Sequence, residues 1–460
     1  MRDRRMRNRM RSVEKMRRRN SAYHSNDYDQ QIGVSNTGKR IAVFVVIVSI
    51  MALLCVAMMF ALKVLHSEFS SKTIQSRQQS STKIKINNDA KRVKNNDNSK
   101  NKAIVEDNRN VDTILAKMTL EDKVAQMFMV RPEDLSGFKG VVTASGSQTK
   151  QSFDALPVGG VMYSADNLQN SNQTKTMISG LQKISESRLS LPAFISVDEE
   201  GGTVARVSIN KSMGVNKSPN MSDVGASGDV NNAKKIGKYM GSYLSNLGFN
   251  VDFAPVADVL TNPRNTLIKY RSFGSDPALV ARMTSAFSNG LWDSHVFATY
   301  KHFPGHGSTF TDSHKGTTIS QITESELDKT DLVPFKDAVR NGVSFIMVSH
   351  VSYPKVTGDN TPASMSKKIM TDIAREKLGY KGILISDSLG MGAITNKYNS
   401  ADAAVTGIKA GLDMLLCPQD LHQAYNAVIN AVKKGDISQS RIDQSVRRII
   451  AAKLRIANKN

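Results

Sequence analysis

Reactive side chains are concentrated between Lys301 and His314, in the segment KHFPGHGSTFTDSH. The segment combines three histidines with a lysine and an aspartate, and a proline and two glycines shape it as a loop. An apolar, β-prone run at 296–300 precedes it, so we expect Lys301 and His302 to lie where a strand ends. Enzymes built on parallel strands present reactive side chains at this end. A solvated loop is the alternative, but the chain has only eight histidines, so the cluster predicts a functional site.

Polar residues also follow four other apolar runs that read as strands. In chain order they are Asp198-Glu199-Glu200, Asp258, Ser349-His350 and Asp387. The carboxyl ends of the strands of a parallel barrel all meet at one face, so these side chains should converge there. Each has a simpler explanation when taken alone. Glu199 and Glu200 could be solvated, and Asp258 could cap a turn.

The elements that would position these residues begin after residue 110. Eight short apolar runs alternate with amphipathic stretches, which predicts an α/β fold, a (β/α)₈ TIM barrel, over residues 111–460. The expected strands are 124–130, 158–163, 193–197, 250–254, 296–300, 344–348, 383–386 and 412–416. The expected helices are 167–187, 230–247, 277–294, 324–341, 366–378, 401–410, 420–434 and 438–457.

The first 110 residues predict three segments of a different kind. Residues 1–40 are arginine-rich and polar, which predicts a disordered basic tail in the cytoplasm. Residues 41–62 carry no charge, and a helix of this length spans roughly 33 Å, enough to cross a bilayer core of about 30 Å. Residues 63–110 are rich in Ser, Asn, Lys and Gln, which predicts a flexible linker. Lys39 and Arg40 directly before the apolar run favour a single-pass membrane protein with an extracellular catalytic domain.

Charge and cysteine content exclude other classes of protein. The formal net charge is +21, but most of the excess lies in residues 1–110 rather than on the expected barrel. We therefore expect no nucleic-acid binding. The two cysteines are Cys55 and Cys417, and Cys55 falls inside the apolar run, which argues against an intrachain disulfide.

The residue types at the strand ends indicate the class of chemistry. The sequence contains no Gly-x-Ser-x-Gly elbow, no phosphate-binding GxxxxGK[ST] loop and no GxGxxG after a strand. Carboxylates beside cationic and imidazole donors suit a substrate rich in hydroxyl groups. Glycoside hydrolysis needs one group to protonate the leaving oxygen and a carboxylate to attack or to activate water.

The combined motifs resemble glycoside hydrolase family 3, and in particular its single-domain β-N-acetylhexosaminidase branch. The resemblance rests on KHFPGHG followed by DSH, with DEEGG upstream and SDSLGM downstream, and covers about 112–456. It implies that Asp387 is the nucleophile, His314 the general acid/base and Asp312 its orienting partner. It also implies that N-acetylglucosamine is held by five residues: Asp198, Arg206, Arg271, Lys301 and His302. No cofactor and no metal ion are implied.

Histidine suits the role that the resemblance gives to His314. Its unperturbed pKa is about 6.5, so it can donate and accept a proton near neutral pH. A carboxylate two residues away, Asp312, can hold the ring's orientation and tautomer. The departures from the family pattern are Thr203, where arginine is common, and Tyr270, directly before RSFG.

The residues together with the resemblance imply a retaining exo-β-N-acetylglucosaminidase that forms a covalent glycosyl-aspartate. The extracellular site makes peptidoglycan or muropeptides the expected source of terminal β-linked N-acetylglucosamine. Two alternatives stay open: a metal-dependent hydrolase using His302, His306 and His314, and a non-catalytic membrane-tethered barrel that binds the cell wall. The natural glycan and the oligomeric state also stay open.

Overall fold

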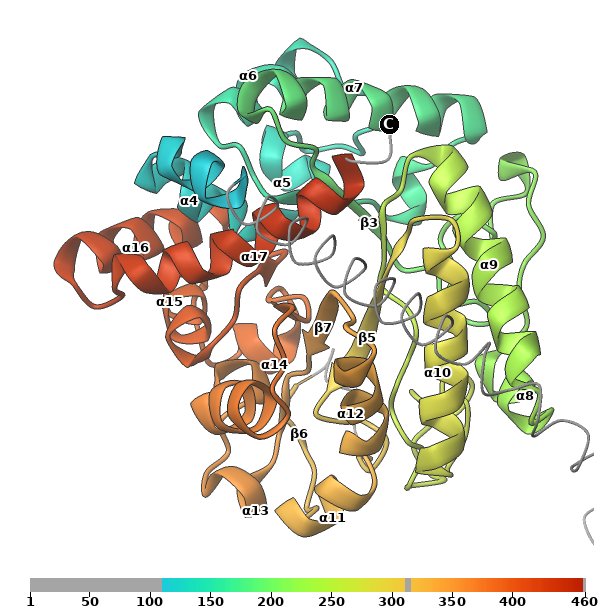
Figure 1. Ribbon diagram of the computed structural model, residues 1–460. Coiled ribbons are helices and arrows are strands. Elements are labelled where there is room, and N and C mark those ends of the chain that lie inside the picture. Colours follow the sequence, from blue (N-terminus) through green and yellow to red (C-terminus); the bar gives the residue numbers. More distant parts are fainter. Residues whose placement is uncertain (1–109, 311–315, 458–460) are drawn as a thin grey trace, which may run out of the picture. The chain divides into compact units, whose positions relative to one another are not determined.

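The computed structural model describes residues 110–310 and 316–457 (Figure 1). The predicted cytoplasmic tail, the apolar run 41–62, the predicted linker, Asp312 and His314 all lie outside the described residues. In the part of the chain that the structure describes, no helix is both long enough and apolar enough to span a membrane.

Eight parallel strands form a sheet that is nearly closed into a barrel. The order of neighbours is β10-β1-β2-β3-β4-β5-β7-β9. The two edge strands, β9 and β10, are joined by one parallel bridge between Ile385 and Met414. The strands are β1 (Phe128–Val130), β2 (Gly160–Met162), β3 (Phe194–Val197), β4 (Val251–Asp252), β5 (Phe297–Phe303), β7 (Phe345–Val348), β9 (Ile383–Ser386) and β10 (Leu415–Leu416). Two further short strands, β6 (Thr318–Ile319) and β8 (Val351–Ser352), form a separate parallel pair. Along the chain, β6 follows β5 and β8 follows β7.

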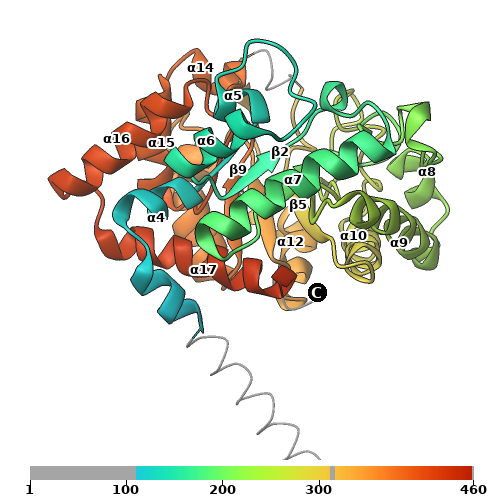
Figure 2. The same cartoon turned by 90° about the horizontal axis from the view of Figure 1, so that it is seen from above.

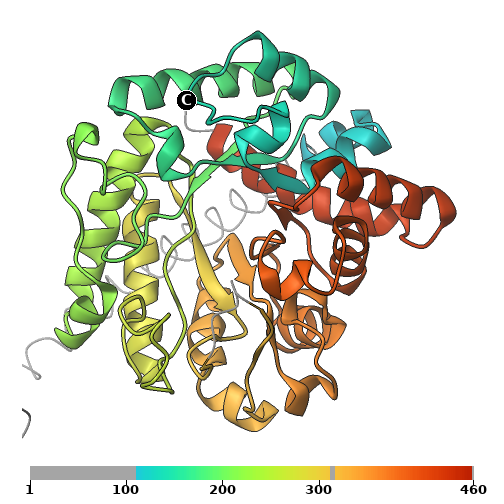
Figure 3. The ribbon, with the colours of Figure 1, turned by 180° about the vertical axis from the view of Figure 1, so that it is seen from behind.

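Helices surround these strands in chain order, as Figures 1 and 3 show from opposite sides. The longer ones are α7 (Ser171–Leu189), α9 (Val230–Leu247), α10 (Pro277–Trp292), α12 (Leu332–Arg340), the π-helix η4 (Lys368–Lys377), α15 (Ser400–Ala410), α16 (Leu421–Lys434) and α17 (Gln439–Ala457). Shorter helices are α4 (Leu120–Gln126), α5 (Pro132–Ser136), α6 (Ser147–Ala155), α8 (Met221–Ala226), α11 (Glu324–Lys329), α13 (Pro354–Thr357) and α14 (Gly392–Thr395). Three single turns are η1 (Ala165–Asn167), η2 (Lys211–Met213) and η3 (Ala363–Met365). Helix α4 packs against α16 and α17, as Figure 2 shows from above.

The sequence explains these elements locally. Strands β3, β7 and β9 are four-residue runs buried at every position, as expected where helices cover a parallel sheet. Phe194 of β3 meets Phe345 of β7 edge-to-face at 5.1 Å between ring centroids, so side chains fill the barrel interior. Helix α10 begins at Pro277, and the Asp276 side chain accepts from the amide of Ala278.

Two glycines let α9 and α10 approach closely. A Cβ on Gly237 would lie 2.2 Å from the carbonyl oxygen of Phe287, and one on Gly290 would lie 2.3 Å from that of Lys234. Any side chain at either position would push the helices apart, and α10 in turn packs against β5.

Several expected boundaries are wrong. The predicted strand 124–130 begins as helix α4, capped by Thr119, and only β1 is extended. The buried Val124 and Ala125 therefore belong to a helix, a distinction that a short apolar run does not reveal. The predicted helix 324–341 is two helices, α11 and α12. Strand β5 continues through Phe303, so Lys301 and His302 lie within the strand and not after it.

A buried carboxylate ties α17 to the barrel strands. Asp413, which is fully buried, accepts from Arg375 and Arg448, from the Ser445 hydroxyl and from the Leu384 amide. Burial works to raise the pKa of Asp413, but the arginines and Ser445 lower it further than burial raises it.

Replacing Asp413 by Asn should therefore lower the free energy of unfolding by about 3–5 kcal/mol, because it leaves three half-buried guanidinium groups without their carboxylate. Since the pKa of Asp413 is lower in the folded protein, its contribution is present at neutral pH and is lost as the pH falls through the folded-state pKa. Urea unfolding followed by circular dichroism at pH 7 measures the loss. The exposed Asp166→Asn is the control, and equal midpoints for the two variants would contradict the role of Asp413.

Candidate active site

Lys301, on β5, is the centre of a buried network of charges. Its Nζ lies 2.7 Å from Asp198 Oδ1 and 2.6 Å from Glu200 Oε1, and its side chain is only 3% exposed. Burial works to lower the pKa of Lys301, but the two carboxylates raise it further, so the ammonium stays charged at neutral pH. β3 thus supplies, just past its end, the carboxylates that hold a lysine of β5.

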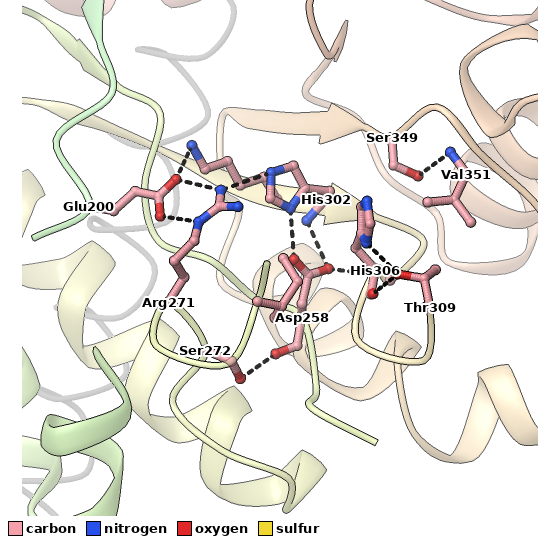
Figure 4. Close-up of polar contacts among 12 residues, drawn as sticks. Glu200, Asp258, Arg271, Ser272, His302, His306, Thr309, Ser349 and Val351 are labelled. Atoms are coloured by element: carbon pink, nitrogen blue, oxygen red, sulfur yellow. Dashed lines mark hydrogen bonds and ion pairs between the residues drawn. The ribbon is translucent and has the colours of Figure 1, made fainter. Parts of the chain in front are cut away.

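Glu200 links that lysine to Arg271. Its carboxylate receives two parallel hydrogen bonds from the guanidinium, at 2.7 Å from Nε and 2.8 Å from Nη2 (Figure 4). Burial works to raise the pKa of Glu200, but Arg271 and Lys301 hold it far below its usual range. The carboxylate is therefore ionised and neutralises part of the positive charge of both partners.

His302 is held between Arg271 and Asp258. Its Nδ1 lies 2.7 Å from Asp258 Oδ2, and its Nε2 lies 3.3 Å from Arg271 Nη2 (Figure 4). A guanidinium nitrogen only donates, so Nε2 accepts and the ring proton resides on Nδ1, which donates to Asp258. Asp258 also accepts from the backbone amides of His302 and His306, so a single carboxylate orients the start of the histidine-rich loop.

Glu199 positions the segment that carries Arg206. Its carboxylate is fully buried and accepts from the amides of Arg206, Val207 and Ser208 at 2.6, 2.8 and 3.0 Å. The hydroxyl of Tyr243 donates to it as well, at 2.8 Å. Three amides on one carboxylate fix the backbone here, and Arg206 lines the same pocket as Lys301.

Asp387 directly follows β9 and faces that pocket. Its Oδ1 accepts from the amide of Ser388 at 2.7 Å. Burial works to raise the pKa of Asp387, but the imidazoles of His302 and His350, the Ser388 amide and Lys301 lower it further. The carboxylate is therefore anionic at neutral pH, as a nucleophile must be.

A cavity of about 770 Å³ brings most of the predicted site residues together. Its lining includes Asp198, Arg206, Arg271, Lys301, His302 and Asp387, together with Glu200. Tyr270, a departure from the family pattern, is 49% exposed and lines it too. The sequence reasoning thus identified six residues that share one pocket at the carboxyl ends of the strands. The remaining two predicted residues, Asp312 and His314, fall in 311–315, outside the described residues.

Residues 306–309, which lead into 311–315, are held by hydrogen bonds and by a close backbone approach. Asn265 donates to the His306 carbonyl at 2.9 Å, and Asn262 donates to the Thr309 carbonyl at 2.8 Å. A Cβ on Gly307 would lie 1.7 Å from the carbonyl oxygen of Val259, so only glycine allows this close approach. Beyond residue 315, β6 pairs with β8.

The arrangement of the described histidines bears on the metal-site hypothesis. His302 uses one ring nitrogen for Asp258 and faces Arg271 with the other, and His306 Nδ1 lies 2.8 Å from the Thr309 hydroxyl. Burial lowers the pKa of His306 to about 4, so it is neutral at pH 7. Within residues 110–310 and 316–457, no group of three or more His, Cys, Asp or Glu side chains is placed to hold a metal ion.

Three contributing carboxylates had no assigned role in the sequence analysis. Glu199 and Glu200 are buried, contrary to the solvated alternative, and Asp258 orients His302 instead of only capping a turn. Their position after β3 and β4 was the available signal. Their partners lie from 7 residues away, for Glu199 and the Arg206 amide, to 101 residues away, for Glu200 and Lys301, and sequence spacing alone does not reveal them.

Comparison with known proteins agrees with the barrel fold. Residues 119–452 match the Glycosyl hydrolase family 3 N terminal domain. Beta-hexosaminidase LpqI of Mycobacterium tuberculosis is 32% identical over 349 residues, which cover 74% of this chain and 84% of that protein. Beta-hexosaminidase A of Pseudoalteromonas piscicida is 31% identical over 343 residues, 69% of this chain and 57% of that protein.

A solved structure is similar over the same region. The family 3 β-N-acetylglucosaminidase from Paenibacillus sp. str. FPU-7 has a TM-score of 0.69 and 35% identity, covering 75% of this chain and 64% of that one. The matched region therefore covers less than two thirds of the Paenibacillus chain and of the Pseudoalteromonas protein. The barrel, with its charged pocket at the carboxyl ends of the strands, defines the class of protein. This chain belongs to glycoside hydrolase family 3.

Replacing Glu199 by Gln should loosen the segment that carries Arg206. The amide nitrogen that replaces one oxygen cannot accept, and a buried unpaired N–H costs about 1–3 kcal/mol. We expect amide exchange at 206–208 to become roughly thirtyfold faster, the equivalent of about 2 kcal/mol. Hydrogen–deuterium exchange with mass spectrometry measures it, with the exposed Glu186→Gln on α7 as the control. Unchanged exchange at these amides would show that Glu199 does not hold the segment.

Proposed function

We propose that this protein is a retaining exo-β-N-acetylglucosaminidase that hydrolyses terminal β-linked N-acetylglucosamine through a covalent glycosyl-aspartate. The observation that carries the proposal is that the anionic Asp387 shares one pocket with Lys301, His302, Arg271 and Asp198. The names of the relatives, β-hexosaminidase and β-N-acetylglucosaminidase, support the choice of sugar. Release of a chromophore from a chromogenic β-N-acetylglucosaminide by the full chain tests it directly, and no release would overturn it.

The polar network suits an uncharged ligand with many hydroxyl groups. Lys301 and Arg271 are each already paired with a carboxylate, so the pocket does not demand a charged substrate. Hydroxyl groups both donate and accept, and here Asp198 offers oxygens while the cations offer N–H groups. In the proposed complex these three residues, with Arg206 and His302, hold the hydroxyl and acetamido groups of the terminal sugar.

The chemical step needs an anion next to the anomeric carbon, on the face of the sugar ring opposite the leaving oxygen. In the proposed reaction Asp387 forms a bond to that carbon as the bond to the leaving oxygen breaks, and water later hydrolyses the resulting ester. The buried four-residue strand β9 ends at Ser386, so a rigid element carries the nucleophile. Its lowered pKa keeps it ionised and ready to attack.

His314 is the proposed proton donor to the leaving oxygen, with Asp312 as its orienting partner. The protonated imidazole can first give its proton to the leaving oxygen, and the neutral imidazole that remains can then accept a proton from the incoming water, because the couple titrates near neutral pH. Histidine also avoids a second negative charge beside Asp387, which two carboxylates in the same roles would create. The support for this assignment is the resemblance of the 301–314 motif to the family.

The proposal extends to the location of the enzyme. We propose that residues 41–62 cross the membrane once, with the N-terminus in the cytoplasm and the catalytic domain outside. The support is the uncharged run directly after Lys39 and Arg40. An extracellular site would meet peptidoglycan or its muropeptide fragments, whose N-acetylglucosamine is β-linked.

Asp387→Asn should abolish turnover of the chromogenic substrate, because the neutral amide does not form the glycosyl ester. In the wild type, a slowed fluoro-glycosyl donor should leave its adduct on the peptide that contains Asp387, and proton NMR should show the β-anomer as first product. The exposed Asp436→Asn should retain full activity. An α-anomer, or an adduct on another carboxylate, would contradict the assignment.

His314→Ala should slow substrates with poor leaving groups by about 10²–10⁴-fold and affect activated aryl substrates far less. The reason is that only a poor leaving group needs the proton in the first step. Rates for a series of leaving groups of rising pKa measure the difference, and Asp312→Asn should show a weaker form of it. A uniform loss across the series would contradict the role of His314.

Protease added to intact cells should release a catalytic fragment that begins within 63–110, because that linker is expected to be accessible outside the membrane. Mass spectrometry of the fragment locates its first residue. Protection of the barrel until the cells are lysed would show that the orientation is wrong.

A further inference from the structure

A second cavity lies at the opposite end of the barrel from the candidate active site. Its volume is about 370 Å³, and its walls come from α17 and from the segments that lead into β7 and β9. Ile383, at the start of β9, lines this cavity, whereas Asp387, just past the other end of that strand, lines the active-site pocket. A rise of about 3.3 Å per residue separates the two by roughly 13 Å along the strand.

The lining of this second cavity is positively charged. It contains three arginines of α17 and one lysine of the neighbouring segment, and no aspartate or glutamate. The four are Arg447, Arg448, Arg455 and Lys381. Ala451 and Ala452 lie between the arginines on the same wall, so small side chains leave room in front of the cationic groups.

Carboxylates near the cavity balance only part of this charge. Asp413 is shared by three arginines: Arg448 at 3.0 Å, Arg441 at 3.8 Å and Arg375. Arg447 pairs with Asp112. The structure thus gathers an excess of cations around the cavity that its own described carboxylates do not neutralise.

Arg455 is the clearest case. Its Nη1 donates to the Ser344 hydroxyl at 2.8 Å, and among the described residues no carboxylate forms an ion pair with it. Its guanidinium lies 4.6 Å from the ring centroid of Trp292 and 5.1 Å from that of Phe297. Rings that cover the flat face of a guanidinium leave the N–H groups at its edge able to donate.

We propose that this cavity binds a phosphate group. Guanidinium groups match the geometry of phosphate oxygens and bind them through paired, charge-assisted hydrogen bonds. Arg455 and Arg448 supply N–H donors from one wall, and Lys381 supplies a point charge from the other. The phosphate group belongs either to a phosphodiester of a larger anionic molecule or to a free phosphate or phosphomonoester.

The intrinsic fluorescence of Trp292 can be used to follow binding at this site. Trp292 is the only tryptophan in the sequence, and Arg455 lies directly against it. An anion that draws on the N–H groups of Arg455 changes the electrostatic field at the indole. We therefore expect the intrinsic fluorescence of the full chain, kept in detergent, to change as phosphate is added.

The experiment titrates the full chain with inorganic phosphate at constant ionic strength, following Trp292 fluorescence and, in parallel, heat by calorimetry. We expect one saturable transition in both. Arg455→Gln should weaken the calorimetric affinity on the order of tenfold, because it removes charge-assisted hydrogen bonds. Lys381→Gln should weaken it less. Arg282→Gln, an exposed site on α10 outside the cavity lining, removes the same charge and should leave the affinity unchanged.

Further arms separate the sources of phosphate and test the inference independently of the active site. Dimethyl phosphate that competes with phosphate would identify a phosphodiester ligand, and competition by glycerol phosphate alone would identify a phosphomonoester. Arg455→Gln should cleave the chromogenic glycoside as the wild type does, because the cavity lies at the other barrel end. A signal that follows ionic strength without saturating, or equal affinity in Arg455→Gln and Arg282→Gln, would overturn the proposal.

Discussion

The shared carboxylate of Glu200 is the interaction on which the candidate site depends. It binds Lys301 and Arg271 at the same time and is itself almost completely buried. Each of these charges would be costly to bury alone, and together they satisfy one another. Because Glu200 follows β3, Lys301 lies on β5 and Arg271 follows the β4 region, this carboxylate also fixes three parts of the barrel mouth against one another.

That interaction determines how the neighbouring groups are arranged. Nη2 of Arg271 donates one N–H to Glu200 and directs its second N–H to His302. The ring nitrogen of His302 that accepts is therefore Nε2. Asp258 holds the other nitrogen and two backbone amides. The positions of the donors are thus determined before any ligand binds, which lowers the ordering cost of binding.

The sequence was sufficient to predict the eight runs that contain the barrel strands, but not the pair β6 and β8 or the continuation of β5 through Phe303. The run 383–386 was correctly predicted to the residue, and 193–197 and 344–348 to within one residue, because continuous apolar sequence is typical of a strand covered on both faces. The run at 124–130 was assigned to one strand and is divided between α4 and β1, since periodicity does not separate short buried helices from short buried strands. Glu199 and Glu200 look like surface residues in the sequence. Their burial is explained only by partners distant in the sequence. Glu199 is held by Tyr243 and the amides of 206–208, and Glu200 by Lys301 and Arg271.

The proposed assignment gives the two chemical roles to different kinds of element. A nucleophile must approach one carbon along one line, and the rigid β9, bonded on both sides to its neighbours, suits that task. A group that gives a proton and then takes one back serves two different partners in turn, the leaving oxygen and the incoming water. A loop can supply such a group if its ends are held. At one end the side-chain amide of Asn265 donates to the His306 carbonyl and that of Asn262 donates to the Thr309 carbonyl, and the pairing of β6 with β8 holds the other end. The anchoring of this loop therefore matters as much to the proposed reaction as the placement of Asp387.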